Sequence, residues 1–279
     1  MLWRESMLGI NLFFQDIANP LLDKFFLYVS YLITDIPLVL VLCFIYWCVD
    51  KEKGLKIGFI LLNSMMINFI VKDIFKVDRP YVKDSRIINK DIKYGYGYSF
   101  PSNHSQLASG LVFSLYKVFG NIKYLITGFF TVLLVAISRI YLGVHSILDV
   151  TVGFLLGLVL VPLFGVFIDY VCKSKKYYLG YIFIILGLMG IIAFGDEDSL
   201  KITMVYLGFL TGLIVENKLI GYKIPGTGFR KTANFLMGVL GVAVIYIFLS
   251  GWIKYLLIGF WVSLGAPFIF KVLNGKDEV

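Results

Sequence analysis

Apolar residues in this chain are gathered into long runs that short polar connections separate. Nine runs have a length and hydropathy typical of membrane-spanning helices, which need about 20 mainly apolar residues to cross a bilayer. They lie at about 36–49, 55–75, 105–119, 124–142, 146–168, 178–194, 200–215, 233–250 and 255–272. The pattern predicts an all-α fold, a polytopic bundle of about nine transmembrane helices.

The segment before the first run has a different pattern. Between residues 8 and 34, apolar side chains such as Phe13, Phe14 and Ile17 recur at helical spacing among polar ones. Pro20 interrupts the pattern, which then repeats. We expect two helices that lie in the membrane interface or pack on the bundle, and the alternative is that they extend the first span.

Composition and charge support a membrane protein. The 279 residues are 59% hydrophobic and 16% charged, whereas soluble domains average about 45–50% apolar and about 25% charged residues. This excludes a disordered chain and an ordinary soluble enzyme. The net charge of +8 fits basic cytoplasmic loops and anionic lipid phosphates. Since no basic run is interleaved with aromatic residues on a soluble face, we expect a phospholipid bilayer as partner and no nucleic acid.

The distribution of basic residues predicts an orientation. In the nine-span arrangement, five polar segments share one side and carry more than half of the Lys and Arg residues. These segments are 50–56, 117–123, 173–177, 216–232 and 271–279. Basic loops favour the cytoplasmic side. The longest polar loop, 76–104, is then expected on the extracytoplasmic face, and loops of that length are usually functional.

Three cations are expected on one helical face at the start of this loop. Lys72, Lys76 and Arg79 are spaced i, i+4 and i+7, and the helix is expected to stop at Pro80. Such charges repel one another unless an anion lies among them. Two neighbouring aspartates could neutralise them in part, and a bound phosphate is the functional alternative.

The two histidines of the chain, His104 and His145, are expected at the same membrane face. Ser102 is a plausible N-cap for the third span, and a helix N-terminus binds anions. His104 would stand beside that anion, where it could protonate a leaving oxygen. A plain cap followed by an interfacial histidine is the simpler interpretation.

His145 and Asp149 are four residues apart and therefore share a face of a predicted helix. A carboxylate there could accept the Nδ1–H of the imidazole and leave Nε2 free as a nucleophile or base. A structural His–Asp pair is the alternative.

Arg139 precedes a turn expected at Gly143. Its planar guanidinium suits a phosphoryl group, and the alternative is that the side chain only snorkels to the membrane interface.

These pieces converge on phosphoryl transfer without a metal, because cations, a helix N-terminus and two histidines are expected near one membrane surface. No His, Cys or carboxylate set has metal-ligand spacing, so we expect no metal and no cofactor. An anion transporter is the rival from another class. It would be expected to carry polar residues through the bilayer, whereas the runs after residue 178 hold almost none apart from Glu216.

The residues resemble the tripartite signature of the type 2 phosphatidic acid phosphatases, a superfamily that also includes vanadium haloperoxidases. The three segments are Lys72-x6-Arg79-Pro80, Pro101-Ser102-x-His104 and Ser138-Arg139-x5-His145-x3-Asp149. The likeness covers residues 8 to about 168. It implies a six-helix phosphatase-like core within 1–172. The further spans in 173–279 are similar to those of the longer sphingosine-phosphate phosphatases.

The resemblance implies a role for each matching residue. His145 would attack phosphorus and become a phosphohistidine, with Asp149 raising its nucleophilicity, and His104 would protonate the leaving group. The phosphoryl oxygens would be held by Lys72, Arg79, Ser102, Arg139 and the backbone N–H of Asn103. The expected function is a membrane lipid phosphatase, or a lipid phosphotransferase if an acceptor hydroxyl replaces water.

Two positions depart from the family pattern. Asn103 stands where the family usually has glycine, which keeps the backbone N–H but adds a side chain that narrows the pocket. The second Arg-Pro pair that often follows the first is replaced by Tyr81 and Val82. We expect little catalytic consequence from the second departure.

Overall fold

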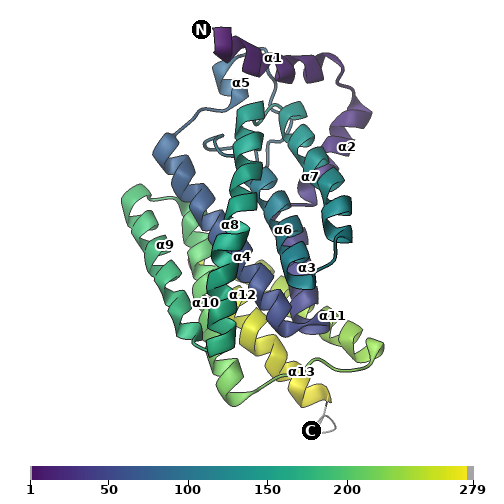
Figure 1. The fold of residues 1–279 in the computed structure, drawn as a ribbon, viewed down its shortest axis with the longest axis vertical. Helices are drawn as coiled ribbons and strands as arrows, with labels where there is room; N and C mark the ends of the chain where they lie inside the picture. Colours follow the sequence, from purple (N-terminus) through teal and green to yellow (C-terminus); the bar gives the residue numbers. More distant parts are fainter. Residues whose placement is uncertain (1, 275–279) are drawn as a thin grey trace. The chain divides into compact units, whose positions relative to one another are not determined.

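The computed structural model describes residues 2–274, and every regular element in that range is a helix (Figure 1). The chain divides into two compact units. Unit 1 consists of Met1–Leu38 and Asn63–Gly165, and unit 2 consists of Val39–Leu62 and Val166–Val279. Two long helices continue from one unit into the other. The domain boundary expected after residue 172 stays a prediction, and Lys276 of the expected basic tail lies outside the described residues.

Unit 1 is organised around helix α7 (Lys123–Tyr141), which packs against three other helices of the unit. These are α1 (Leu2–Asp16), α2 (Pro20–Tyr31) and α6 (Asn103–Phe119). The unit also contains the end of α4 (Lys51–Phe75), the short α5 (Pro80–Lys83) and the start of α8 (Ile147–Ser174).

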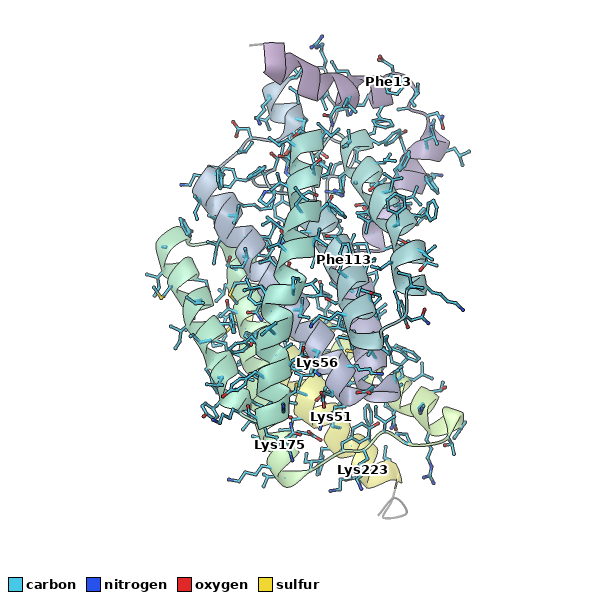
Figure 2. The ribbon with its side chains drawn as sticks, in the orientation of Figure 1. Phe13, Lys51, Lys56, Phe113, Lys175 and Lys223 are labelled. Atoms are coloured by element: carbon cyan, nitrogen blue, oxygen red, sulfur yellow. The ribbon has the colours of Figure 1, made fainter. Side chains whose placement is uncertain are left out.

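The two helices expected before the first span are present, and they separate at Pro20 as the pattern indicates. Asn19 caps α2, because its Oδ1 accepts the backbone N–H groups of Leu21 and Leu22, each at 3.1 Å. On α1, the Phe13 side chain is 60% exposed, and Figure 2 shows it at the surface. By length and composition, Pro20–Tyr31 and the bent segment that follows it, Ile36–Val49, also qualify together as one broken span, so the alternative of a longer first span stays open.

Unit 2 is built on helix α10 (Glu197–Leu219), which packs against α9 (Tyr181–Phe194) and α12 (Gly251–Phe260). Gly208 permits this contact, because a Cβ there would lie 1.9 Å from the backbone oxygen of Leu256. The remaining elements are α3 (Asp35–Phe44), which begins in unit 1, with η1 (Ile45–Val49), η2 (Tyr177–Gly180), α11 (Gly228–Phe248), η3 (Trp261–Gly265) and α13 (Ala266–Asn274).

One end of unit 2 is basic. Figure 2 shows Lys51, Lys175 and Lys223 at this end. The acidic N-terminus of α10, at Glu197, lies at the other end of that helix. The buried Glu216 carboxylate binds the Lys51 ammonium and accepts the Tyr222 N–H at 2.7 Å, so its charge is satisfied inside the unit. The charge separation agrees with the loop pattern from which the orientation is predicted.

All nine apolar runs of the sequence fall on helices. Within the described residues, seven helical segments are long and apolar enough to cross a membrane, or eight if the bent pair counts as one span. Helix α6 has 17 residues, shorter than a typical span. The polytopic all-α class is therefore confirmed, and the count of nine stays a prediction.

Candidate active site

Helix α4 ends before Pro80, where the helix was expected to stop. Helix α4 ends at Phe75, and Lys76 adopts a left-handed conformation with φ of 48°, which stops the helix. Pro80 begins the next helix instead of ending this one, since proline is well suited to the first helical position. The prediction of three cations on one helical face is therefore wrong: Lys76 is exposed, whereas Arg79 is buried in the loop.

Arg79 lies beside His145. Its Nη1 is 3.4 Å from His145 Nε2 and donates to the backbone oxygen of Val144 at 2.9 Å. Its Nε donates to the backbone oxygens of Tyr96 and Gly97, both at 3.0 Å. Because carbonyl oxygens carry no net charge, these contacts fix the guanidinium without cancelling its positive charge.

The loop also holds Lys72, on the last turn of α4. The Lys72 ammonium donates to the backbone oxygen of Tyr98 at 2.6 Å and to that of Ser99 at 3.3 Å. Ser99 is tied back to the chain that follows α4, because its N–H donates to the Val77 oxygen at 2.8 Å. Backbone carbonyls of one short segment therefore hold both cations.

Ser102 is the N-cap of α6, as expected. Its Oγ accepts the N–H of Ser105, at 3.4 Å, and the helix begins at Asn103. The Ser102 N–H donates to the Asp149 backbone oxygen at 2.9 Å. Gly153 allows this close approach, because a Cβ there would lie 2.4 Å from the Ser102 oxygen. The start of α6 is thus fixed against the first turns of α8.

His145 lies in the turn between two helices and not on a helix with Asp149. Gly143 makes the expected turn with φ of 74°, and α8 begins two residues after His145. His145 Nδ1 is 3.8 Å from Asp149 Oδ2, which is longer than a hydrogen bond. The same oxygen accepts the Ser146 N–H at 2.7 Å, and Ser146 Oγ accepts the Asp149 N–H at 3.3 Å. Asp149 and Ser146 therefore form a reciprocal cap on α8.

Helix α1 supports the turn that carries His145. The buried Asn11 side chain donates through Nδ2 to the backbone oxygen of Ile140 at 2.8 Å and to that of His145 at 3.0 Å. This contact was not anticipated from the sequence, where Asn11 is one polar residue in an amphipathic segment. The N-terminal helix is therefore part of the site's support.

Arg139 is completely buried and has a carboxylate partner that the sequence did not indicate. Its Nη1 donates to Asp91 Oδ2 at 2.6 Å and to the Ser30 hydroxyl. Asp91 lies in the polar loop, 48 positions earlier in the chain. The Nε and Nη2 atoms of Arg139 have no hydrogen-bond partner within residues 2–274. The guanidinium is thus anchored on one side, and its other donors remain available for an anion.

His104 lies in the first turn of α6 and is almost fully buried. Its ring meets that of Tyr94 edge to face, with centroids 5.9 Å apart and an interplanar angle of 73°. His104 Nε2 has no hydrogen-bond partner in the described part of the chain. The charges of Lys72, Arg79 and Arg139 act on both histidine rings, so the predicted residues share one electrostatic environment.

That environment keeps His145 neutral. Burial lowers the pKa of His145 well below its ordinary value of about 6.5, and the positive charges of Arg79, Arg139 and Lys72 lower it further. A neutral imidazole can act as a nucleophile, whereas an imidazolium cannot. The arrangement thus combines an unprotonated histidine with fixed cations that would bind an oxyanion.

Comparison with known proteins agrees with the resemblance in the sequence. The family model described as "PAP2 superfamily" matches residues 53–173. A second model, described as "PAP2 superfamily phosphatase, transmembrane extension", matches residues 201–277. The first model covers all the signature residues, and the second covers the last helices of the chain.

The relatives are phosphatases by name. Sphingosine-1-phosphate phosphatase 1 of Rattus norvegicus is 29% identical over 68% of this chain and 46% of its own length, so the chain spans about half of that protein. Lipid A 4'-phosphatase of Porphyromonas gingivalis is 31% identical over 56% of this chain and 68% of its own.

The crystal structure of Aquifex aeolicus LpxE superimposes with a TM-score of 0.51 and 25% identity, covering 57% of this chain and 94% of that one. The sequence signature, the two family models and this shared fold agree. The chain belongs to the PAP2 superfamily and carries the superfamily's transmembrane extension.

Proposed function

We propose that this protein is an integral membrane phosphatase that hydrolyses a lipid phosphate monoester or diphosphate through a phosphohistidine, without a metal. The observation that carries the proposal is the 3.4 Å approach of Arg79 Nη1 to His145 Nε2. A phosphoryl oxygen bound by Arg79 would bring phosphorus within reach of a neutral imidazole. The names of the relatives, which refer to sphingosine-1-phosphate and lipid A, support a lipid phosphate as the substrate class.

In the first step, His145 Nε2 attacks phosphorus and forms a P–N bond. The P–O bond to the leaving group breaks, and its electron pair stays on the leaving oxygen. His104, which is protonated once the negative charge of the bound phosphate offsets the cations around its ring, donates a proton to that oxygen. Fixed donors stabilise the charge on the phosphoryl oxygens in the transition state. These donors are Lys72, Arg79, Arg139, Ser102 and the N–H of Asn103.

In the second step, water attacks the phosphohistidine. His104, which has lost its proton, accepts one from the water, the P–N bond breaks, and its electron pair returns to His145. Inorganic phosphate leaves, and both histidines regain their starting protonation states. Asp149 assists by its charge 3.8 Å from His145 Nδ1, and this separation would shorten to a hydrogen bond when the ring becomes positively charged.

The site is assigned to the extracytoplasmic face. The loops expected on the other side of the membrane carry the excess of basic residues, which favours the cytoplasm for that side. Lipid phosphates whose head groups are exposed on that leaflet are therefore the expected substrates.

Phosphate release from a panel of lipid phosphates in detergent tests the proposal. The panel spans a sphingoid monophosphate, a diacylglycerol phosphate and an isoprenoid diphosphate, each with and without EDTA. Activity that survives EDTA is expected, because the protein's own cations meet the phosphoryl charge. If none of these lipids releases phosphate, the proposed function is contradicted. Transfer of the phosphoryl group to an added alcohol instead of water would indicate a phosphotransferase.

A further inference from the structure

Helix α1 contacts both the polar loop and the end of α7. The contacts come from one face of the helix, where Asn11, Phe14 and Gln15 are spaced i, i+3 and i+4. Gln15 Nε2 donates to the backbone oxygen of Ile88 at 2.7 Å, and Gln15 Oε1 accepts the Ile88 N–H at 2.9 Å. The Phe14 ring meets that of Tyr141 edge to face, with centroids 6.3 Å apart. Helix α1 is therefore held in place by contacts that do not involve Asn11.

Asn11 bridges the two ends of the turn between α7 and α8. Its side chain is completely buried, and its Nδ2 donates to the backbone oxygens of Ile140 at 2.8 Å and of His145 at 3.0 Å. Helix α8 begins at Ile147, so the His145 oxygen lies outside both helices. A buried carbonyl in that position needs a partner from another segment, and Asn11 provides it.

The geometry at His145 depends on two such contacts with neighbouring carbonyls. Arg79 Nη1 donates to the Val144 oxygen at 2.9 Å and lies 3.4 Å from His145 Nε2. Arg79 thus sets where a phosphoryl oxygen would bind, whereas Asn11 holds the peptide unit from which the imidazole projects. A misplacement of about 1 Å between reacting atoms can cost about 10²-fold in rate.

We propose that Asn11 is a positioning residue for the attack on phosphorus: its amide holds the His145 backbone so that Nε2 faces a phosphoryl group bound by Arg79. The inference rests on the proposed function, because it needs His145 as the nucleophile. Asn11 lies outside residues 53–173, which the superfamily model matches, and outside the three signature segments. The reaction thereby depends on a residue of the N-terminal helix.

Asn11→Leu tests the inference, because it removes the donor and keeps a side chain of similar size. It is expected to lower kcat about 10²-fold, by the same factor on an alkyl lipid phosphate and on p-nitrophenyl phosphate, since both reactions need the nucleophile. The inhibition constant of inorganic phosphate is expected to stay unchanged, because the cations keep their own contacts.

The matched control is Asn19→Ala. This asparagine also makes two hydrogen bonds in the N-terminal segment, but they cap α2 and do not reach the turn. Its loss is expected to lower the unfolding temperature and to leave kcat unchanged.

A second variant decides the question if Asn11→Leu does not fold. Asn11→Asp keeps the shape of the side chain, but an ionised carboxylate has no donor, whereas a protonated carboxyl group has one. Burial favours the protonated form. The ratio of the variant's kcat to that of the wild type is therefore expected to rise as the pH falls and the hydrogen bond to the turn returns.

Three results would overturn the positioning role. They are an equal fall of kcat in Asn19→Ala and Asn11→Leu, a loss in Asn11→Leu that a weaker binding of inorganic phosphate accounts for, and a kcat ratio for Asn11→Asp that does not change with pH. Turnover retained by His145→Ala, or no phosphate release from any lipid by the wild-type protein, would instead contradict the proposed function.

Discussion

Asp91 and Arg139 form an ion pair in which neither side chain is accessible to solvent, with Asp91 Oδ2 and Arg139 Nη1 2.6 Å apart. Taking two charges out of water is costly, so such a pair is kept together by geometry and by further contacts. Here the Ser30 hydroxyl provides one more, from the end of α2. The polar loop, α2 and α7 are thereby joined at one guanidinium.

This pair leads to the first prediction. Asp91→Ala is expected to lower the free energy of unfolding by roughly 3–5 kcal/mol, because it leaves a buried charge without its partner. It is also expected to lower kcat/KM about 10²-fold, since a small displacement of Arg139 misplaces the phosphate. Thermal unfolding in detergent and phosphate-release kinetics measure the two effects. Asp84→Asn, which breaks the exposed pair with Arg86 in the same loop, is the control, and equal losses in both variants would argue against a special role for Asp91.

The second prediction separates two functions of Asp149. The carboxylate caps α8 through Ser146, and it also lies 3.8 Å from His145 Nδ1. Ser146→Ala removes half of the cap, so it is expected to cost about 1 kcal/mol of stability with little change in kcat. Asp149→Asn is expected to lose a similar stability but several orders of magnitude in kcat, because the amide cannot stabilise a positively charged imidazole. Matching kcat values for the two variants would show that Asp149 is only a cap.

The third prediction concerns the protonation of His145. The chain has two histidines, so the His104→Gln variant leaves a single imidazole whose NMR signal needs no further assignment. Burial and the charges of Arg79, Arg139 and Lys72 lower the His145 pKa. The ring is therefore expected to stay neutral as the pH falls through 6.5 and to gain its proton only well below that value. Inorganic phosphate is expected to raise the His145 pKa, because a bound anion offsets those cations. A titration near 6.5 that is insensitive to phosphate would contradict the site.

The sequence was a good guide where the physical signal is local. Long apolar runs predicted the helices, Pro20 and Gly143 predicted breaks in the chain, and Ser102 predicted a helix cap. Each of these rests on hydrophobic spacing or on the backbone preference of one residue. The resemblance to a known signature then identified the candidate site and the family.

Contacts between distant segments could not be predicted in that way. Asp91 has no periodic or motif signal, because its partner Arg139 lies on a helix 48 residues away. The helical face expected for Lys72 and Arg79 fails because the chain turns left-handed at Lys76, a conformation that no sequence pattern indicated. Local rules describe elements, whereas the site depends on how a long loop folds back over them.

The last prediction distinguishes the two histidines by the leaving group. His104 lies at the start of α6, beside the proposed phosphate position, and is assigned as the general acid. A general acid matters most when the leaving oxygen is strongly basic. His104→Ala is therefore expected to lose roughly 10²–10⁴-fold on an alkyl lipid phosphate and much less on p-nitrophenyl phosphate, whose leaving group departs without a proton. His145→Ala is expected to lose all measurable turnover on both substrates, because each needs the nucleophile. Initial rates for the two variants on the two substrates, with Arg86→Gln as a loop control, decide the assignment.

Equal losses on both substrates for His104→Ala would mean that His104 binds phosphate and donates no proton. Turnover retained by His145→Ala would remove it as the nucleophile.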